Sequence, residues 1–207
     1  DYSHSQYNFI EEGKKPLGTA FFPFMAAAGF ANGLTPATTV EDEPMDNRTI
    51  MVGGREGILG EWGAETSKPT FEGLIPTRKA LENSKVSAMV RFGTQAGLEK
   101  VAETAQRFGF EIPEGEKLPR MLVGWEPVSM SEAVSAIGAF ARGGQTGAQK
   151  PVYVERIEDG TGHAVMQRVA QEPPRNLAVD EASAYQVHTM LQGTAQRGNL
   201  RASLQDL

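Results

Sequence analysis

Apolar residues recur every three or four positions along several stretches of the chain, which is the spacing of one face of an α-helix. This spacing predicts helices over about residues 19–31, 77–83, 98–108, 130–142 and 180–197. Thr77 is expected to cap the second helix, and Ser129 with Glu132 has the form of a capping box for the fourth. The side chains expected on the inner face of the fourth helix are Ala133, Ile137 and Phe140.

The same pattern predicts little β-structure. Residues 151–167 alternate apolar and polar side chains around Asp159-Gly160, which is typical of a hairpin. Residues 34–74 are rich in turn-formers, so we expect an irregular segment with a short strand at Thr49–Val52. Together these features predict one α+β domain that is predominantly helical and has a small antiparallel sheet.

Composition narrows the class of protein. The 207 residues are 40% hydrophobic and 22% charged, as in an ordinary globular protein. A net charge of −6 argues against a nucleic-acid-binding protein, which normally presents a basic surface. The absence of cysteine excludes a disulfide and a thiol nucleophile. The most apolar stretch, residues 18–31, is too short to span a membrane. Because the first residue is Asp1 rather than Met, we interpret the chain as a piece of a longer protein.

Isolated motifs do not identify a function. His4, His163 and His188 are far apart in the sequence and follow no metal-ligand spacing, so we expect no metal site and no cofactor. The acidic residues of segment 41–46 lack the pattern of a calcium loop and indicate a solvated loop. The glycine-rich segment 53–57 lacks the Gly-Lys-Ser/Thr ending of a phosphate-binding loop.

Several longer stretches carry more information than any single motif. They are KKPLGTAFFPFMAAAGFANGLTPATTVEDEP (14–44), GLIPTRKALENSKVSAMVRFG (73–93), EPVSMSEAVSAIGAFARGG (126–144) and DEASAYQVHTMLQGTAQRGN (180–199). With the lead-in DYSHSQYN (1–8) and the hairpin PVYVERIEDGTG (151–162), they resemble the transpeptidase domain of class A penicillin-binding proteins. The similar stretches occur in the family's order and cover nearly the whole chain.

The resemblance implies a penicillin-binding-protein fold, related to the serine β-lactamases, and a site with three motifs. In the Ser-x-x-Lys motif, the two side chains share one helix face, so the lysine amine can take the serine proton. The serine then attacks D-Ala-D-Ala or a β-lactam, and N–H groups stabilise the oxyanion. The family's Ser-x-Asn motif relays protons and fixes the substrate amide, and its Lys-Thr-Gly strand pairs with the substrate.

This chain departs from the family at each motif. Thr19 stands at the position of the nucleophile, and Phe22 stands at the position of the lysine base. The second motif reads Ser84-Lys85-Val86, which keeps the serine and loses the asparagine. We therefore expect Thr19 and Ser84 to mark the site, with Phe22 and Val86 as degenerate positions.

The third motif is expected just after Leu207, and no Lys-Thr-Gly occurs in the chain. Gln145-Thr146-Gly147 is similar to it but precedes the hairpin, so we interpret it as a loop. The resemblance thus implies a single transpeptidase-like domain over residues 1–207 that is incomplete at both ends. A further segment or a second copy of the chain is expected to complete the sheet, because an unpaired edge favours association.

Two hypotheses follow for the function. In the first, the domain has lost catalysis and serves peptidoglycan synthesis as a scaffold or binding module for wall peptide or cell-wall assembly proteins. In the second, it is an active D,D-transpeptidase or carboxypeptidase with Thr19 as a divergent nucleophile and a base from Ser84-Lys85 or elsewhere. A weaker alternative places the activity in an upstream glycosyltransferase domain. The resemblance also implies an extracytoplasmic protein, anchored in the membrane by an upstream segment.

Overall fold

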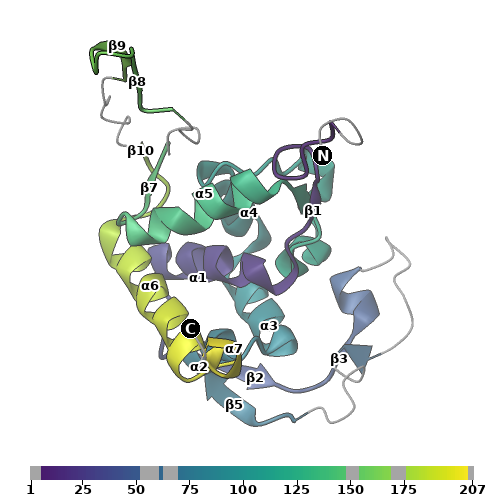
Figure 1. Ribbon diagram of the computed structural model, residues 1–207. Coiled ribbons are helices and arrows are strands. Elements are labelled where there is room, and N and C mark those ends of the chain that lie inside the picture. The colour runs from purple at the N-terminus through teal and green to yellow at the C-terminus, as the bar shows by residue number, and fades with distance from the viewer. Residues whose placement is uncertain (1–5, 52–60, 63–69, 148–153, 169–175, 205–207) are drawn as a thin grey trace.

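Helix α1 (Phe22–Ala31) lies at the centre of a helical body (Figure 1). The computed structural model describes residues 6–51, 61–62, 70–147, 154–168 and 176–204. The other α-helices are α2 (Thr77–Glu82), α3 (Val86–Ala96), α4 (Leu98–Arg107), α5 (Met130–Ala141), α6 (Glu181–Gln196) and α7 (Arg201–Leu204). Short 3₁₀ helices are η1 (Gly18–Phe21), η2 (Asn47–Ile50), η3 (Glu114–Glu116) and η4 (Pro119–Val123).

Helix α1 is apolar on every side, and its residues 22–30 are all buried, as expected for a central helix. It packs against α3, α4 and α6. Glycines permit the close approach of α3: a Cβ at Gly29 would lie 2.4 Å from the ring of Phe92, and a Cβ at Gly93 would lie 2.9 Å from the sulfur of Met25. Within the described ranges, no helix is both long enough and apolar enough to cross a bilayer.

Phenylalanine rings fix the beginning of α1 in the core. The ring centre of Phe24 lies 5.0 Å from that of Phe108, 4.8 Å from that of Phe110 and 5.4 Å from that of Phe140. Phe21 lies 6.2 Å from Phe110. Aromatic pairs at these separations stabilise a core beyond the area that they bury. The turn that precedes α1 is therefore attached to a rigid cluster.

The strands of the described residues form separate two-stranded antiparallel pairs. The pairs are β1 (Lys15–Pro16) with β6 (Pro127–Val128), β2 (Thr39–Asp42) with β5 (Gly73–Pro76), β3 (Met45–Asp46) with β4 (Glu61–Trp62), β7 (Gln145–Thr146) with β10 (Asn176–Leu177), and β8 (Arg156–Glu158) with β9 (Ala164–Gln167). The predicted α+β class, mainly helical with little antiparallel sheet, is confirmed.

Segment 34–74 is more regular than predicted, because its strand β2 pairs with β5 over four residues. The strand predicted at Thr49–Val52 is wrong for the residues that the structure describes, since residues 47–50 form η2. The carboxylate of Asp46 accepts the N–H of Arg48 at 2.8 Å and caps this turn. Position 52 lies outside the described residues.

The beginning of α2 also differs from the prediction. Thr77 is the first residue of the helix rather than its cap, and Pro76 occupies the cap position. The hydroxyl of Thr77 instead donates to the carbonyl of Thr38 at 2.8 Å. This bond connects α2 to the segment just before β2.

Helix α5 begins at the predicted capping box. The hydroxyl of Ser129 accepts the N–H of Glu132, and the carboxylate of Glu132 accepts the N–H of Ser129 at 2.7 Å. That second bond holds the pKa of Glu132 below its ordinary value. Phe140 is buried as predicted, whereas Ile137 is 37% exposed, because the inner face of α5 is formed by residues 136, 139 and 140.

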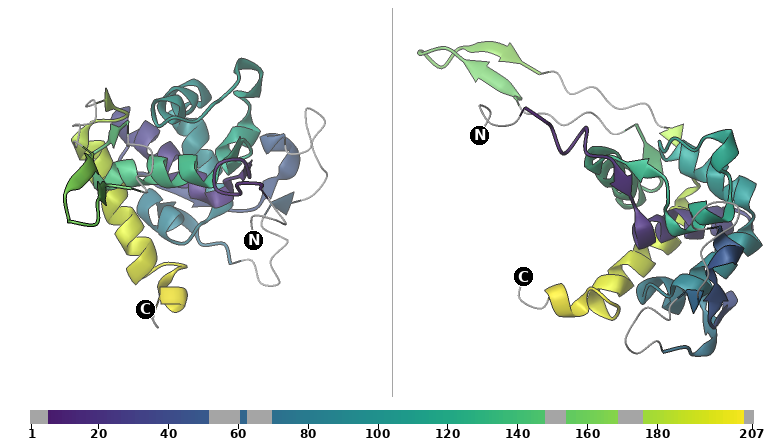
Figure 2. Two further views of the ribbon diagram at one scale, coloured as in Figure 1. Left: turned by 45° about the horizontal axis from the view of Figure 1, so that its top comes forward. Right: turned by 90° about the vertical axis from the view of Figure 1, so that its right-hand side faces the viewer.

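The β8–β9 hairpin extends away from the helical body (Figure 2). Its predicted turn is confirmed: the carboxylate of Asp159 accepts the N–H groups of Thr161 and His163, each at 2.9 Å. The first residues of the predicted hairpin, 151–153, lie outside the described residues. The side chains of both strands are exposed.

Candidate functional site

Thr19 lies in η1, the turn that leads into α1, and its side chain is exposed. We call residues Gly18–Phe21 the Thr19 turn. The N–H of Gly18 donates to the carbonyl of Gly124 at 3.2 Å. A Cβ at Gly124 would lie 2.4 Å from the oxygen of Gly18, so this contact requires glycine. The Thr19 turn is therefore fixed to the residue that follows η4, with Thr19 facing solvent.

Position 22, which the resemblance predicts to be that of the family's lysine, belongs to the core. Phe22 is the first residue of α1 and is 1% exposed. Among the described residues, the hydroxyl of Thr19 has no hydrogen-bond partner. A threonine hydroxyl becomes a nucleophile only when a base lies within hydrogen-bond reach. The Thr19 turn thus presents a hydroxyl without a base.

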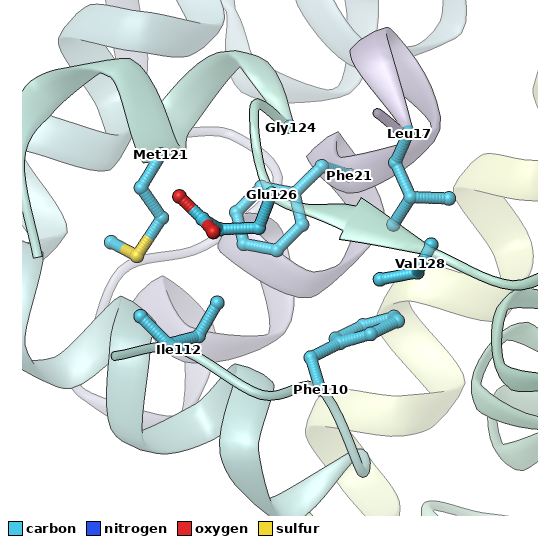
Figure 3. A pocket seen from close by; sticks show the side chains of 8 residues that line it. All are labelled: Leu17, Phe21, Phe110, Ile112, Met121, Gly124, Glu126 and Val128. Carbon is cyan, nitrogen blue, oxygen red and sulfur yellow. The ribbon is translucent and has the colours of Figure 1, made fainter. Parts of the chain in front are cut away.

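A small apolar pocket lies behind the Thr19 turn (Figure 3). Its lining includes Leu17 and Phe21 from the start of the chain, and Met121 and Glu126 from in and just after η4. Its volume is about 10 Å³, which is room for one water molecule. One carboxylate oxygen of Glu126 is buried without a partner, and burial followed by the charge of Glu116 raises the pKa of Glu126. The pocket is too small for a peptide.

Ser84 directly follows α2 and has a left-handed backbone, with φ of 51°. Its N–H donates to the carbonyl of Leu81 at 3.0 Å, and the N–H of Lys85 donates to that of Ala80 at 2.8 Å. These two bonds form a Schellman motif, in which the left-handed position is usually glycine. We call residues 83–86 the Ser84 turn. A serine at this position keeps its hydroxyl in a conformation that is strained for any side chain.

Val86 is the residue that the resemblance predicts at the position of the asparagine of the family's second motif. It is the first residue of α3, and its partly buried side chain packs against the core. An isopropyl group neither donates nor accepts a hydrogen bond. Of the two polar groups expected in the second motif, this stretch therefore offers only the hydroxyl of Ser84, which has no hydrogen-bond partner in the part of the chain that the structure describes.

Lys85 is held by acidic residues beside β2. Its ammonium lies 2.9 Å from the carboxylate of Asp42 and 3.4 Å from that of Glu72, and it donates to the carbonyl of Thr70. Asp42 is only 1% exposed. Burial acts to lower the pKa of Lys85, but the hydrogen bonds and charges of Asp42 and Glu72 outweigh it and leave that pKa raised. The amine stays protonated at neutral pH, so it is poorly suited to take a proton from a nucleophile.

Glu82, the last residue of α2, is a buried carboxylate that connects α2 to α6. Its Oε1 accepts from the guanidinium of Arg197 at 2.7 Å and lies 3.5 Å from that of Arg78. A Cβ at Gly193 would lie 1.9 Å from the same oxygen, so α6 crosses α2 at a glycine. This ion pair fixes the end of α6 beside the Ser84 turn.

The two candidate turns are attached to different parts of the fold. Within the described ranges no hydrogen bond joins the Thr19 turn to the Ser84 turn. The Thr19 turn is bonded to Gly124, whereas Lys85 is bonded to Asp42. The structure also contains, among the residues described, no group of three or more His, Asp or Glu side chains that could hold a metal.

The stretch that is similar to Lys-Thr-Gly lies elsewhere. Gln145 and Thr146 form β7 rather than a loop, and the hydroxyl of Thr146 donates to the carbonyl of Asn176 in β10 at 3.1 Å. This pair of strands leads from α5 toward the hairpin (Figure 1). The loop interpretation was wrong because β10, which comes 30 residues later, supplies the pairing partner.

Sequence reasoning missed the buried carboxylates on both sides of the Ser84 turn. Asp42 lies in the acidic segment that indicated a solvated loop, and the structure corrects that interpretation for this residue. Its neighbour Val40 is also buried while Glu41 is exposed, so alternation within 39–42 was the available signal. For Glu82 the signal was Arg78 four residues earlier on the same helix face.

The chain matches the family model for the penicillin-binding protein transpeptidase domain over residues 16–206. It therefore belongs to the penicillin-binding protein transpeptidase family, and the predicted resemblance is confirmed.

Individual relatives and solved structures that are similar to this chain are also penicillin-binding proteins. The chain is 30% identical to penicillin-binding protein 1A of Pseudomonas aeruginosa over 183 aligned residues. The aligned region covers 88% of this chain and 21% of that protein. The fold is similar to penicillin-binding protein 1A of Haemophilus influenzae, with a TM-score of 0.79 and 19% identity over 100% of this chain and 35% of that one. It is also similar to the imipenem acyl-enzyme of penicillin-binding protein A from M. tuberculosis, with a TM-score of 0.71 and 18% identity over 94% of this chain and 47% of that one. The chain thus spans about a fifth of the length of its Pseudomonas relative.

Proposed function

We propose that this chain is a transpeptidase-type module of peptidoglycan synthesis that binds wall peptide or a cell-wall assembly protein without forming an acyl-enzyme. Membership of the transpeptidase family supports the first half of the proposal. The observation that carries the second half is Phe22, an apolar residue that is 1% exposed where the family has its base.

The remaining polar groups supply no replacement for that base. The hydroxyl of Thr19 has no hydrogen-bond partner among the described residues, and the ammonium of Lys85 is paired with Asp42 and protonated at neutral pH. Val86 removes the amide that would orient a substrate. Nucleophile and base act as a unit, so the loss of one member removes most of the chemical rate. A scaffold or binding role needs none of these groups.

We also propose that the module works outside the cytoplasm and is anchored through an upstream segment. Peptidoglycan peptide, the ligand class implied by the family, is found on that side of the membrane. A chain without cysteine is compatible with an oxidising compartment.

The β-structure motivates a proposal about partners. In the described part of the chain every sheet has two strands, and such pairs are marginal in water unless something packs on them. Exposed apolar side chains lie on the hairpin segment at Val154, Ile157, Val165 and Met166. A strand from a second copy, or from another segment of the protein, would cover these edges. Light scattering on the full chain tests the second copy, and a monomer at all concentrations would exclude it.

Acylation is tested directly with a fluorescent penicillin. The full chain is incubated with it and analysed by gel fluorescence and intact mass spectrometry, with penicillin-binding protein 1A of Pseudomonas aeruginosa as the positive control. We expect no stable adduct on this chain. An adduct that disappears in Thr19→Ala would overturn the proposal and favour the active enzyme with a threonine nucleophile.

A further inference from the structure

We propose that Asn199 is a positioning residue that holds Ser84 in its left-handed conformation and thereby presents the Ser84 hydroxyl to a bound peptide. This inference rests on the proposed function, because it concerns the peptide that the module is proposed to bind. It assigns a role to the segment that follows α6, which none of the three family motifs includes.

The contact consists of two hydrogen bonds from one residue. The backbone N–H of Asn199 donates to the carbonyl of Glu82 at 3.2 Å, and its side-chain amide donates to the carbonyl of Asn83 at 2.7 Å. These carbonyls belong to the two residues directly before Ser84. They are carbonyl groups at the end of α2, which have no partner within the helix.

Residues 197 and 198 also bring the segment after α6 close to the end of α2. A Cβ at Gly198 would lie 1.9 Å from the carbonyl oxygen of Glu82, so only glycine can stand there. The ion pair between Glu82 and Arg197, at 2.7 Å, fixes the residue just before that glycine. Three consecutive residues, 197–199, therefore contact the end of α2 through a charge, a close backbone approach and an amide.

The other side of the Ser84 turn is fixed as well. Lys85 is attached to the buried carboxylate of Asp42 at 2.9 Å. Ser84 thus lies between two attachments, Asn199 before it and Asp42 after it, and its strained φ persists because both neighbours are held. Its hydroxyl is half-buried and, in the described part of the chain, has no partner, so it remains available to a peptide carbonyl or N–H.

The test compares the unmodified full chain with variants in which one asparagine side-chain amide is replaced. Asn199→Ala removes the side-chain donor, and Asn199→Asp keeps the shape but places a carboxylate against the carbonyl of Asn83. Asn32→Ala is the matched control, because the amide of Asn32 donates to the carbonyl of Ala28 at 2.7 Å at the end of α1. Each variant is checked for folding by circular dichroism.

Two readouts separate positioning from general stability. The first is the backbone coupling constant and carbon chemical shifts of Ser84 by NMR, which report φ. We expect them to move toward right-handed values in both Asn199 variants and to stay unchanged in Asn32→Ala. The second is the affinity for a synthetic pentapeptide ending in D-Ala-D-Ala, which we expect to fall about fivefold, the effect of one hydrogen bond, in the Asn199 variants alone.

The outcomes distinguish the inference from the proposed function. Unchanged Ser84 signals in Asn199→Ala and Asn199→Asp would overturn the positioning role, whether or not the peptide binds. Shifted signals in those variants, with no peptide binding by the unmodified chain, would support the positioning of Ser84 and reject the peptide-binding function. Equal loss of affinity in Asn32→Ala would assign the effect to stability and overturn the inference.

Discussion

The Thr19 turn and the Ser84 turn, which the family resemblance predicts to belong to one site, differ in their structure. At the Thr19 turn, the position predicted for the base belongs to the core, with Phe22 1% exposed. At the Ser84 turn, the hydroxyl remains and the backbone is strained, with φ of 51°. The first turn carries a core side chain at the position predicted for the base, whereas the second has a strained backbone.

The difference has a physical basis. Position 22 is surrounded by apolar side chains, where a phenylalanine is stable and an unpaired ammonium is not. Ser84 lies at a helix end between the charged residues Glu82 and Lys85, and both of these are paired with partners from distant segments. This strain is the physical ground for the role in peptide binding that we propose for the Ser84 turn.

The largest effect is expected at Phe22. Phe22→Ala should lower the free energy of unfolding by about 3–5 kcal/mol, because it opens a cavity in the core around α1. Chemical denaturation measures the change. Phe9→Ala is the control, since Phe9 is 70% exposed, and it should change stability by less than about 0.5 kcal/mol. A small effect at Phe22 would show that this position is not part of the packed core.

Next in size is Lys85→Met, which leaves Asp42 as a buried carboxylate without its cation. Removal of one partner of a buried ion pair should lower the free energy of unfolding by about 3 kcal/mol at pH 7. The exposed Lys100, which has no ion pair in the described part of the chain, gives the control Lys100→Met with little change. Equal losses in the two variants would mean that the Asp42 contact contributes nothing specific.

The same ion pair predicts a dependence on pH. The pKa of Lys85 is raised above its ordinary value of 10.5, since Asp42 and Glu72 together outweigh burial, which acts to lower it. A raised pKa means that the stabilisation is fully present below pH 10.5 and is lost as the pH rises through the folded value. Unfolding curves from pH 8 upward should therefore show the difference between Lys85→Met and the unmodified chain shrinking above pH 10.5. A constant difference would contradict the pairing.

A smaller loss is expected for Glu82→Gln. The side chain of Arg197 is 57% exposed, so water can solvate it when its partner loses charge, and the loss should be about 1–2 kcal/mol. Glu103→Gln is the matched control, because Glu103 lies 3.9 Å from Arg107 in an exposed pair on one helix, and it should change stability by less than about 0.5 kcal/mol. Thermal unfolding at low and high salt compares them. Equal effects would place Glu82 among ordinary surface ion pairs.

The sequence was sufficient for the features that depend on neighbouring residues. Helix α6, the capping box at Ser129 and the turn at Asp159 all rest on side chains within a few positions of one another. The pairing of β2 with β5 was missed, because the two strands are more than 30 residues apart and β2 contains two charged residues, Glu41 and Asp42. At the site, the resemblance predicts the positions of Thr19 and Ser84, and it carries no information about their geometry.

That geometry depends on distant partners. The left-handed backbone of Ser84 is accompanied by bonds from Asn199, and Lys85 is paired with Asp42, more than 40 residues away. A helical spacing carries no information about such contacts. The burial of Phe22 was easier to predict from the sequence, because the whole of segment 21–30 is apolar and indicates a central helix.

A gain in stability is expected for the variant Ser84→Gly. Glycine adopts positive φ without strain, so the free energy of unfolding should rise by about 1 kcal/mol. Ser135→Gly, at an exposed position inside α5, should instead lower it by about 0.5–1 kcal/mol. If Ser84→Gly also lowered stability, the left-handed conformation would not be a source of strain, and the contrast between the two turns would lose its basis.

The smallest effect is expected at Thr19, and it completes the comparison. Its side chain is exposed and its hydroxyl has no partner among the described residues, so Thr19→Ala should change the free energy of unfolding by less than about 0.5 kcal/mol. Affinity for a pentapeptide ending in D-Ala-D-Ala should also stay within twofold, whereas Ser84→Ala should weaken it about fivefold through the loss of one hydrogen bond. Titration calorimetry on the two variants measures both affinities. Equal weakening in Thr19→Ala and Ser84→Ala would mean that the hydroxyl of Thr19 also contacts the peptide. The two turns would then not differ in their part in peptide binding.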